Sequence, residues 1–83
     1  MGKCLEVYGL NTADGGQVDL WDYYGGANQK WSIQLTDNGY YKIINANSGK
    51  ALDVNGASLN NGVAAVQWTY SGGRNQQWGF VKI

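Results

Sequence analysis

The chain of 83 residues has no histidine, only one cysteine and no surplus of either charge. A disulfide within the chain is excluded, because Cys4 has no second cysteine to pair with. A structural metal site is not expected from a single cysteine without histidine, and we expect no cofactor. Six basic residues balance six acidic ones, which argues against nucleic-acid binding, since that function normally needs a basic surplus.

Long apolar stretches are also missing. No run of 18 apolar residues occurs, so we expect no transmembrane helix and no membrane insertion, and residues 1–6 lack the apolar core of a signal peptide. The length suggests one domain. A chain this short buries only about 60–65% of its unfolded surface and is marginally stable without help. Disulfides are excluded and a metal is not expected, whereas oligomerisation remains open as a source of stability.

What the chain does contain is an internal repeat. The phrase GGANQKW at residues 25–31 returns as GGRNQQW at 72–78. A shift of 47 residues pairs 1–36 with 48–83 without a gap. Thirteen of these 36 pairs are identical, and all four tryptophans fall into register. A period of this size indicates a repeat architecture. We therefore expect a single domain, 1–83, made of two repeats of about 1–36 and 37–83.

Short β-strands are predicted along the whole chain. Apolar and polar residues alternate with the period of two that is typical of strands. Turns rich in glycine and asparagine separate them, and Asp37-Asn38-Gly39 predicts a hairpin. Strands spaced in this way favour an all-β sandwich or barrel without helices. The expected strands are 3–8, 17–23, 30–36, 40–45, 50–55, 64–70 and 77–83.

The repeated motifs resemble those of the ricin B-chain-type lectins and of related carbohydrate-binding modules of bacterial glycosidases. The likeness rests on GKCLEV, VDLWDYYGGANQKW, GKALDV and VQWTYSGGRNQQW, and it covers essentially the whole chain. It implies a β-trefoil, a barrel of three four-stranded repeats, of which two are present here. It also implies a secreted or extracellular protein. Oligomerisation or a longer chain would complete the fold. In many members the equivalent of Cys4 forms a disulfide, but its partner position here holds Tyr23.

Trp21 and Trp68 are the first candidates for contact with a sugar. On the predicted strands they lie opposite the apolar face, where a pyranose ring can stack on them. The alternative is a small hydrophobic cluster under the loops. Glu6 and Asp53 recur at one repeat position beside them, and a carboxylate accepts strong hydrogen bonds from hydroxyl groups. An ordinary solvated acid is the alternative for each.

Amide side chains complete the two candidate sites. Asparagine can both donate and accept, as hydroxyl recognition requires, but it also stabilises turns. The resemblance implies that each glutamine holds the acid and the loop from behind, and Tyr24 could close the first site from the side. Trp31 and Trp78 are assigned to the core. The candidate carbohydrate-binding residues are Glu6, Trp21, Tyr24, Asn28 and Gln29 in the first repeat, and Asp53, Trp68, Asn75 and Gln76 in the second.

These residues favour non-catalytic carbohydrate binding, with avidity from several shallow sites. The resemblance implies galactose-type or xylan-type glycans as partners. A glycosidase would need two carboxylates held across a cleft, and among the six acids only Asp19 and Asp22, near Trp21, suggest a pair. A protein-interaction or purely structural trefoil is the alternative, because fold does not determine function. For assembly we expect a homotrimer first, since three copies of two repeats make two trefoils, and a dimer second.

Overall fold

The computed structural model describes residues 2–82, which form short strands and single 3-10 turns. No α-helix occurs in this part of the chain, so the expectation of an all-β protein is confirmed. The strands are β1 (Lys3–Val7), β2 (Val18–Asp22), β3 (Trp31–Leu35), β4 (Tyr41–Asn45), β5 (Ala51–Val54) and β6 (Ala65–Trp68). The turns are η1 (Tyr8–Leu10), η2 (Ala27–Gln29), η3 (Asn55–Ala57) and η4 (Arg74–Gln76).

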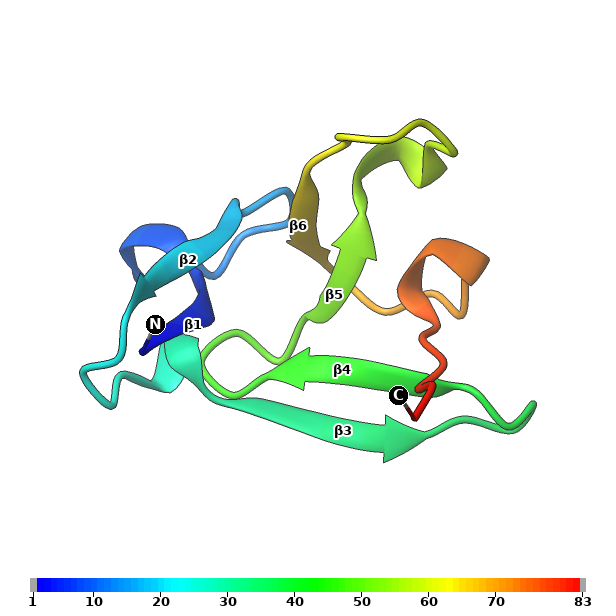
Figure 1. Ribbon diagram of the computed structural model, residues 1–83, viewed down its shortest axis with the longest axis horizontal. Helices are drawn as coiled ribbons and strands as arrows, with labels where there is room; N and C mark the ends of the chain where they lie inside the picture. The colour runs from blue at the N-terminus through cyan, green and yellow to red at the C-terminus, as the bar shows by residue number, and fades with distance from the viewer. Residues whose placement is uncertain (1, 83) are drawn as a thin grey trace.

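The strands form three antiparallel pairs, which lie on three sides of a roughly triangular arrangement (Figure 1). β1 pairs with β2, and the other four strands form a sheet in the order β3-β4-β5-β6. Within that sheet, β4 and β5 share only the pair Ile44–Ala51. The predicted hairpin turn joins β3 to β4, with Gly39 at a φ of +85°. A left-handed φ of this kind favours glycine, which has no Cβ to clash.

The sequence repeat is also a repeat in backbone conformation. Each first strand is followed by a 3-10 turn that contains a left-handed glycine, with a φ of 67° at Gly9 and 66° at Gly56. The next residue is left-handed as well, at 60° for Leu10 and 54° for Ala57. A left-handed conformation is uncommon for residues other than glycine. Its recurrence 47 residues apart shows that both repeats build this turn in the same way.

The prediction of a seventh strand over 77–83 is wrong. Trp78 forms an isolated bridge to Tyr41, and residues 79–82 are not in a strand; Ile83 lies outside the described residues. The equivalent strand in the first repeat, β3, pairs along its whole length with β4. Residues 79–82 have no such ladder with any described segment. Alternation in the sequence predicts the strand's two faces, but a strand also needs hydrogen bonds from a neighbour.

The hydrophobic core of the described residues is small. Within residues 2–82, only Val7, Ala51, Leu52 and Val66 are buried apolar residues. Trp31 and Trp78, which were expected in the core, are only partly buried. Both are nevertheless anchored in the same way. The indole N–H of Trp31 donates to the carbonyl of Leu5 at 3.1 Å, and that of Trp78 donates to Leu52 at 3.2 Å.

An open apolar face, formed by Ile33, Leu35 and Phe80, lies beside these tryptophans. The three side chains are 56%, 66% and 60% exposed. Ile33 and Leu35 alternate along β3 on one side. Leu35 pairs across the hairpin with Tyr41, whose ring lies 5.2 Å from that of Phe80. The face that was expected to be core is therefore left uncovered by the described residues.

Gln67 joins the two repeats. Its side chain is fully buried and donates to the carbonyls of Asn11 and Ala13, at 2.8 and 2.9 Å. It also accepts a hydrogen bond from the hydroxyl of Ser48 at 2.7 Å. Its backbone pairs with the loop at 15–16. If the loop of the first repeat moved away, the buried amide of Gln67 would lose its hydrogen-bond partners, which is costly. Gln67 therefore holds this loop against the second repeat.

Asp14 makes a second connection between the repeats, at the protein surface. Its Oδ1 accepts hydrogen bonds from the backbone N–H and the hydroxyl of Thr69, at 2.7 and 2.9 Å. The ammonium of Lys50 lies 3.5 Å away. The hydrogen bonds from Thr69, and to a smaller extent the charge of Lys50, lower the pKa of Asp14 below its ordinary value. All of these interactions favour the ionised carboxylate.

The lowered pKa of Asp14 predicts a contribution to stability that depends on pH. A carboxyl group whose pKa is lower in the folded state stabilises the fold above its unfolded pKa of about 3.9, and this contribution disappears as pH falls through the folded value. We therefore expect Asp14→Asn to lower the urea midpoint at pH 7 and to leave it nearly unchanged near pH 2. Equal losses at both pH values would contradict this. Asp37→Asn, for which the structure gives no such contacts, is the control.

Candidate functional site

The acid and the tryptophan of the second repeat come from neighbouring strands and share a face. Asp53 lies on β5 and Trp68 on β6, and their cross-strand partners place them on the same side of the hairpin. Asp53 is only 5% exposed. Its Oδ2 accepts from the amide of Gln76 at 2.9 Å, and its Oδ1 accepts from Asn75 at 3.1 Å. A carboxylate offers about four lone-pair sites, so these two amides leave capacity for a ligand.

A depression of about 310 Å³ opens over this acid. Trp68 stands at its edge with 44% of its surface exposed. An aromatic ring beside a fixed carboxylate combines an apolar platform with a directed acceptor, which is typical of binding sites with a few placed polar groups. The lining residues are Asp53, Asn55, Gly56, Ala57, Trp68, Ser71, Asn75 and Gln76.

Gln76 is the clamp of the second site. Its amide nitrogen donates both to Asp53 and to the carbonyl of Thr69, the latter at 3.0 Å. Its amide oxygen accepts from the backbone N–H of Ser71 at 2.8 Å. One buried side chain therefore connects the acid on β5, the chain that leaves β6 and the turn η4. This geometry agrees with the supporting role that the resemblance implied for the glutamine.

The first repeat has the same clamp. Gln29 donates to Glu6 at 3.0 Å and to the carbonyl of Asp22 at 2.8 Å. Its oxygen accepts from the backbone N–H of Tyr24 at 2.8 Å. Each contact is the counterpart, 47 residues earlier, of one made by Gln76. The longer side chain of glutamate is accommodated, and Glu6 is only 3% exposed.

The two asparagines are in different environments. Asn28 is completely buried; it donates to the carbonyl of Val7 at 2.9 Å and accepts from the hydroxyl of Tyr24 at 3.0 Å. Asn75 is partly exposed, and its nitrogen reaches the acid of its own site. Among the described residues, none donates to the Oδ1 of Asn75. The turn-stabilising alternative therefore fits Asn28 better than it fits Asn75.

The structure brings four of the predicted residues together around one depression, namely Asp53, Trp68, Asn75 and Gln76. In the first repeat, hydrogen bonds join Glu6 to Gln29 and Tyr24 to both Gln29 and Asn28. Trp21 lies across from Cys4, which is a free thiol. Sequence reasoning missed the rim of the second site at Asn55, Ala57 and Ser71. The repeat could have identified Ser71, because a shift of 47 residues pairs it with Tyr24, a predicted residue of the first site.

Asp19 faces Glu6 directly across β1 and β2. Its Oδ1 is buried and accepts no hydrogen bond from the described residues. The counterpart of Asp19 in the second repeat is Val66, so this second carboxylate is specific to the first repeat. Within residues 2–82 no group of three histidine, cysteine, aspartate or glutamate side chains is arranged to hold a metal ion.

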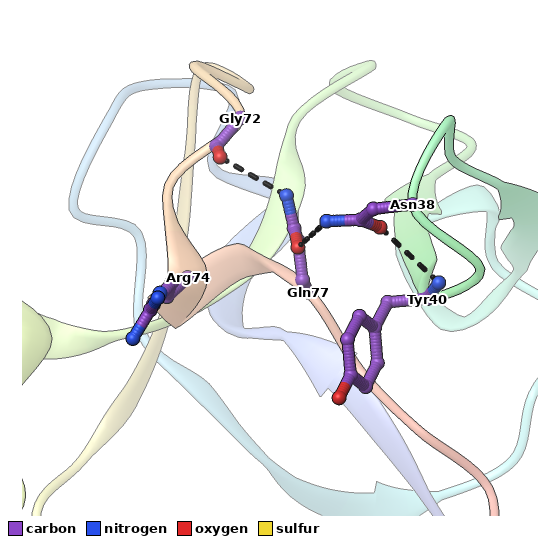
Figure 2. Close-up of a pocket in the computed structure, with 5 residues that line it drawn as sticks. All are labelled: Asn38, Tyr40, Gly72, Arg74 and Gln77. Carbon is purple, nitrogen blue, oxygen red and sulfur yellow. Dashed lines mark hydrogen bonds between the residues drawn. The ribbon is translucent and has the colours of Figure 1, made fainter.

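A larger cavity, of about 590 Å³, lies elsewhere, between the β3–β4 turn and η4 (Figure 2). Asn38 donates to Gln77 at 2.7 Å, and Gln77 donates to the carbonyl of Gly72 at 3.0 Å. Tyr40 and Arg74 stand on opposite sides of this chain of amides. None of the predicted binding residues lines this cavity. The smaller depression is the better candidate, because it holds the repeated acid and tryptophan.

Comparison with known proteins gives a consistent result. The sequence profile of the ricin-type beta-trefoil lectin domain-like family matches residues 1–68 and again residues 27–83. A designed 3-fold symmetric protein, ThreeFoil, is 46% identical and superposes with a TM-score of 0.96. That alignment covers 99% of this chain and 59% of ThreeFoil. The fold is therefore a β-trefoil of ricin-type repeats, as the motifs predicted, with two of its three repeats in this chain.

Two natural proteins are also similar in structure. An exo-beta-1,3-galactanase from Clostridium thermocellum is 37% identical, with a TM-score of 0.90 over 95% of this chain and 17% of the enzyme. A mosquitocidal holotoxin is 27% identical, with a TM-score of 0.85 over 99% of this chain and 10% of the toxin. In both cases this chain spans only a small part of the other protein.

The clamp predicts a specific loss of stability. Gln76→Ala removes the partner of Asp53 Oδ2, of the Thr69 carbonyl and of the Ser71 N–H, although Asp53 Oδ1 keeps its bond from Asn75. We expect unfolding to become easier by about 2–4 kcal/mol, since each unsatisfied buried group costs about 1–3 kcal/mol. Urea denaturation followed by tryptophan fluorescence measures this. Gln34→Ala, at an exposed position on β3, is the matched control and should change stability by less than about 0.5 kcal/mol. Equal effects of the two substitutions would contradict the role of the clamp.

Proposed function

This chain belongs to the ricin-type β-trefoil lectin domain family, and we propose that it is a non-catalytic carbohydrate-binding module. The second repeat carries the binding site, which consists of Asp53, Trp68, Asn75 and Gln76. A galactose-type glycan is the first candidate ligand, because part of a galactanase is similar to this chain. A xylan-type glycan is the second. We also propose that the protein acts outside the cell. No helix within residues 2–82 is long and apolar enough to cross a membrane.

One observation carries the proposal: a carboxylate fixed by two amides at a depression whose edge is an exposed tryptophan. The sugar's apolar C–H face stacks on Trp68, and its hydroxyl groups donate to Asp53. Because Gln76 and Asn75 already orient this acid, little ordering is needed on binding. The depression is small and open, so each site binds weakly, and several sites together provide useful affinity.

Catalysis is not part of the proposal. Hydrolysis of a glycoside needs two carboxyl groups on either side of the scissile bond. The acids that face each other most directly are Glu6 and Asp19. As cross-strand neighbours on one face, these two acids lie side by side and do not stand on either side of a bond. Asp19 and Asp22, the pair considered from the sequence, are three positions apart on β2 and point to opposite faces.

The exposed ring of Trp68 provides the test. Trp68→Ala removes the stacking platform, and we expect at least a tenfold loss of affinity with a thermal midpoint lowered by no more than a few degrees. The matched control is Tyr40→Ala, which removes another half-exposed aromatic from outside the site. Titration with β-1,3-galactobiose and with xylobiose, followed by NMR, measures both variants. Unchanged affinity in Trp68→Ala would remove this residue from the site.

Asp53 is tested by Asp53→Asn, which keeps the size of the side chain and removes the charge. The accepting capacity for sugar hydroxyls is halved, so we expect binding in the same titration to fall at least tenfold. Asp37→Asn, outside the site, should bind normally. A variant that remains folded and binds as tightly as the parent would show that the carboxylate serves only the fold.

We further propose that copies of this chain assemble into a homotrimer through the open apolar face. Ile33, Leu35 and Phe80 are more than half exposed, although β3 and the segment after Trp78 carry strand patterns. Strand edges and apolar faces without a neighbour favour association with other chains. Three chains bring six repeats, which is the number in two trefoils. A dimer is the second arrangement considered.

Leu35→Glu tests the assembly, because it places a charge in the open apolar face. We expect light scattering coupled to size exclusion to give three times the chain mass for the parent and a shift towards monomer for the variant. Leu59→Glu is the control. Leu59 is fully exposed in a loop away from the open apolar face. Its repeat counterpart, Thr12, is also exposed, although the loop of Thr12 packs against the second repeat. A parent chain that is a stable, folded monomer would defeat the proposal.

A further inference from the structure

The two repeats share an acid, a tryptophan and a glutamine clamp, but they differ around these residues. Three rim positions of the second site hold small side chains, Asn55, Ala57 and Ser71. Their counterparts in the first repeat, 47 residues earlier, are larger: Tyr8, Leu10 and Tyr24. All three replacements add bulk to one site, which distinguishes this change from scattered variation on a protein surface.

Tyr24 covers the polar floor of the first site. Its hydroxyl donates to Asn28 Oδ1 at 3.0 Å, while Asn28 Nδ2 donates to Val7. Both ends of this amide are therefore in use, and Asn28 has no exposed surface. The ring of Tyr24 lies so close to Gly26 that a Cβ there would come within 2.5 Å of it. The glycine thus gives the ring room to lie over the loop.

Tyr8 changes the surroundings of Trp21. The two rings meet edge to face, with their centroids 6.2 Å apart. Trp21 remains 48% exposed, so its ring alone could still contact a ligand. Glu6 is about as buried as Asp53, at 3% against 5% exposed, but Asn28 has no exposed surface, whereas Asn75 is partly exposed. A sugar that stacks on Trp21 therefore lacks the amide partner that Asn75 can supply in the second site, and its hydroxyl groups are less well satisfied.

The second site has none of these obstructions. Ser71 donates to the clamp, at 3.2 Å from Gln76 Oε1, and makes no hydrogen bond to Asn75. Asn75 keeps part of its surface exposed, and no described residue donates to its Oδ1. The amide can therefore accept from one sugar hydroxyl while Asp53 accepts from another.

We infer that Tyr8, Leu10 and Tyr24 close the first site, so that the chain binds one saccharide, at the second site. The inference rests on the proposed carbohydrate binding and determines which repeat performs it. Tyr24 acts as the main barrier, because it occupies the hydrogen-bonding capacity of Asn28. The acid and glutamine of the first repeat then have a structural role only: Gln29 and Glu6 hold the strands and the loop together without binding a ligand.

Exchange of the rim between repeats tests the inference. The opened variant is Tyr8→Asn/Leu10→Ala/Tyr24→Ser, and the closed variant is Asn55→Tyr/Ala57→Leu/Ser71→Tyr. Indole N–H signals of Trp21 and Trp68 report on each site separately during NMR titration with β-1,3-galactobiose or xylobiose. In the parent we expect only Trp68 to respond, with one sugar per chain. The opened variant should bind two, with Trp21 responding as well, and the closed variant should lose at least tenfold in affinity at Trp68.

Other outcomes separate this inference from the proposed function. If Trp21 and Trp68 respond together in the parent with similar midpoints, carbohydrate binding stands and the closed site is wrong. If Trp21 stays silent in a folded opened variant, the rim is not the barrier, and the inference is also overturned. If neither tryptophan responds to either sugar, the proposed function fails and the inference fails with it. If the triple exchange does not fold, Tyr24→Phe is a milder variant, because it removes only the hydrogen bond from the hydroxyl to Asn28. A response of the Trp21 signal in this variant supports Tyr24 as the barrier. No response of Trp21 overturns the inference.

Discussion

The buried glutamine of each repeat is the interaction on which the rest of the structure depends. Gln29 and Gln76 each bind an acid on one strand, a carbonyl where the next strand ends and an N–H two residues further along. A single amide has donors and an acceptor in a fixed plane, so it holds all three segments at once. The loops rich in glycine between these segments have little apolar surface to pack, and the polar clamp takes the place of a core there.

The same clamp links stability to the site. The acid is ordered because it is a structural partner of glutamine, and it is buried for the same reason. A binding acid held in this way needs no reorganisation when a ligand arrives. In the second repeat the acid lies at the depression that we propose as the binding site, where Asn75 and Trp68 remain accessible. The first repeat has the same clamp, but its asparagine, Asn28, is buried and accepts a hydrogen bond from the Tyr24 hydroxyl.

The distribution of apolar surface explains the small core. The inter-repeat contacts are largely polar, with Gln67 buried between the loop at 11–13 and Ser48, and Asp14 bound to Thr69. Several large apolar side chains lie instead on the open face at Ile33, Leu35 and Phe80. Apolar burial is the main favourable contribution to folding. Much of the chain's potential stability is therefore available only when another surface covers this face.

Sequence alone determined the features that depend on local chemistry and on the repeat: the all-β class, six of seven strands, the hairpin at Gly39 and the four residues around the second site. Strand periodicity and repeat register need only the order of residues, and the family motifs supplied the fold. Tertiary structure decided the rest. Residues 79–82 have the pattern of a strand but no neighbour to pair with, and Trp31 is only partly buried because its face is open. The sequence predicted a first site of Glu6, Trp21, Tyr24, Asn28 and Gln29, with Tyr24 at its side. The fold decides that Asn28 is buried and bound by the Tyr24 hydroxyl. Whether a side chain covers a site depends on the distances between side-chain atoms in the folded chain, and these distances cannot be read from the order of residues.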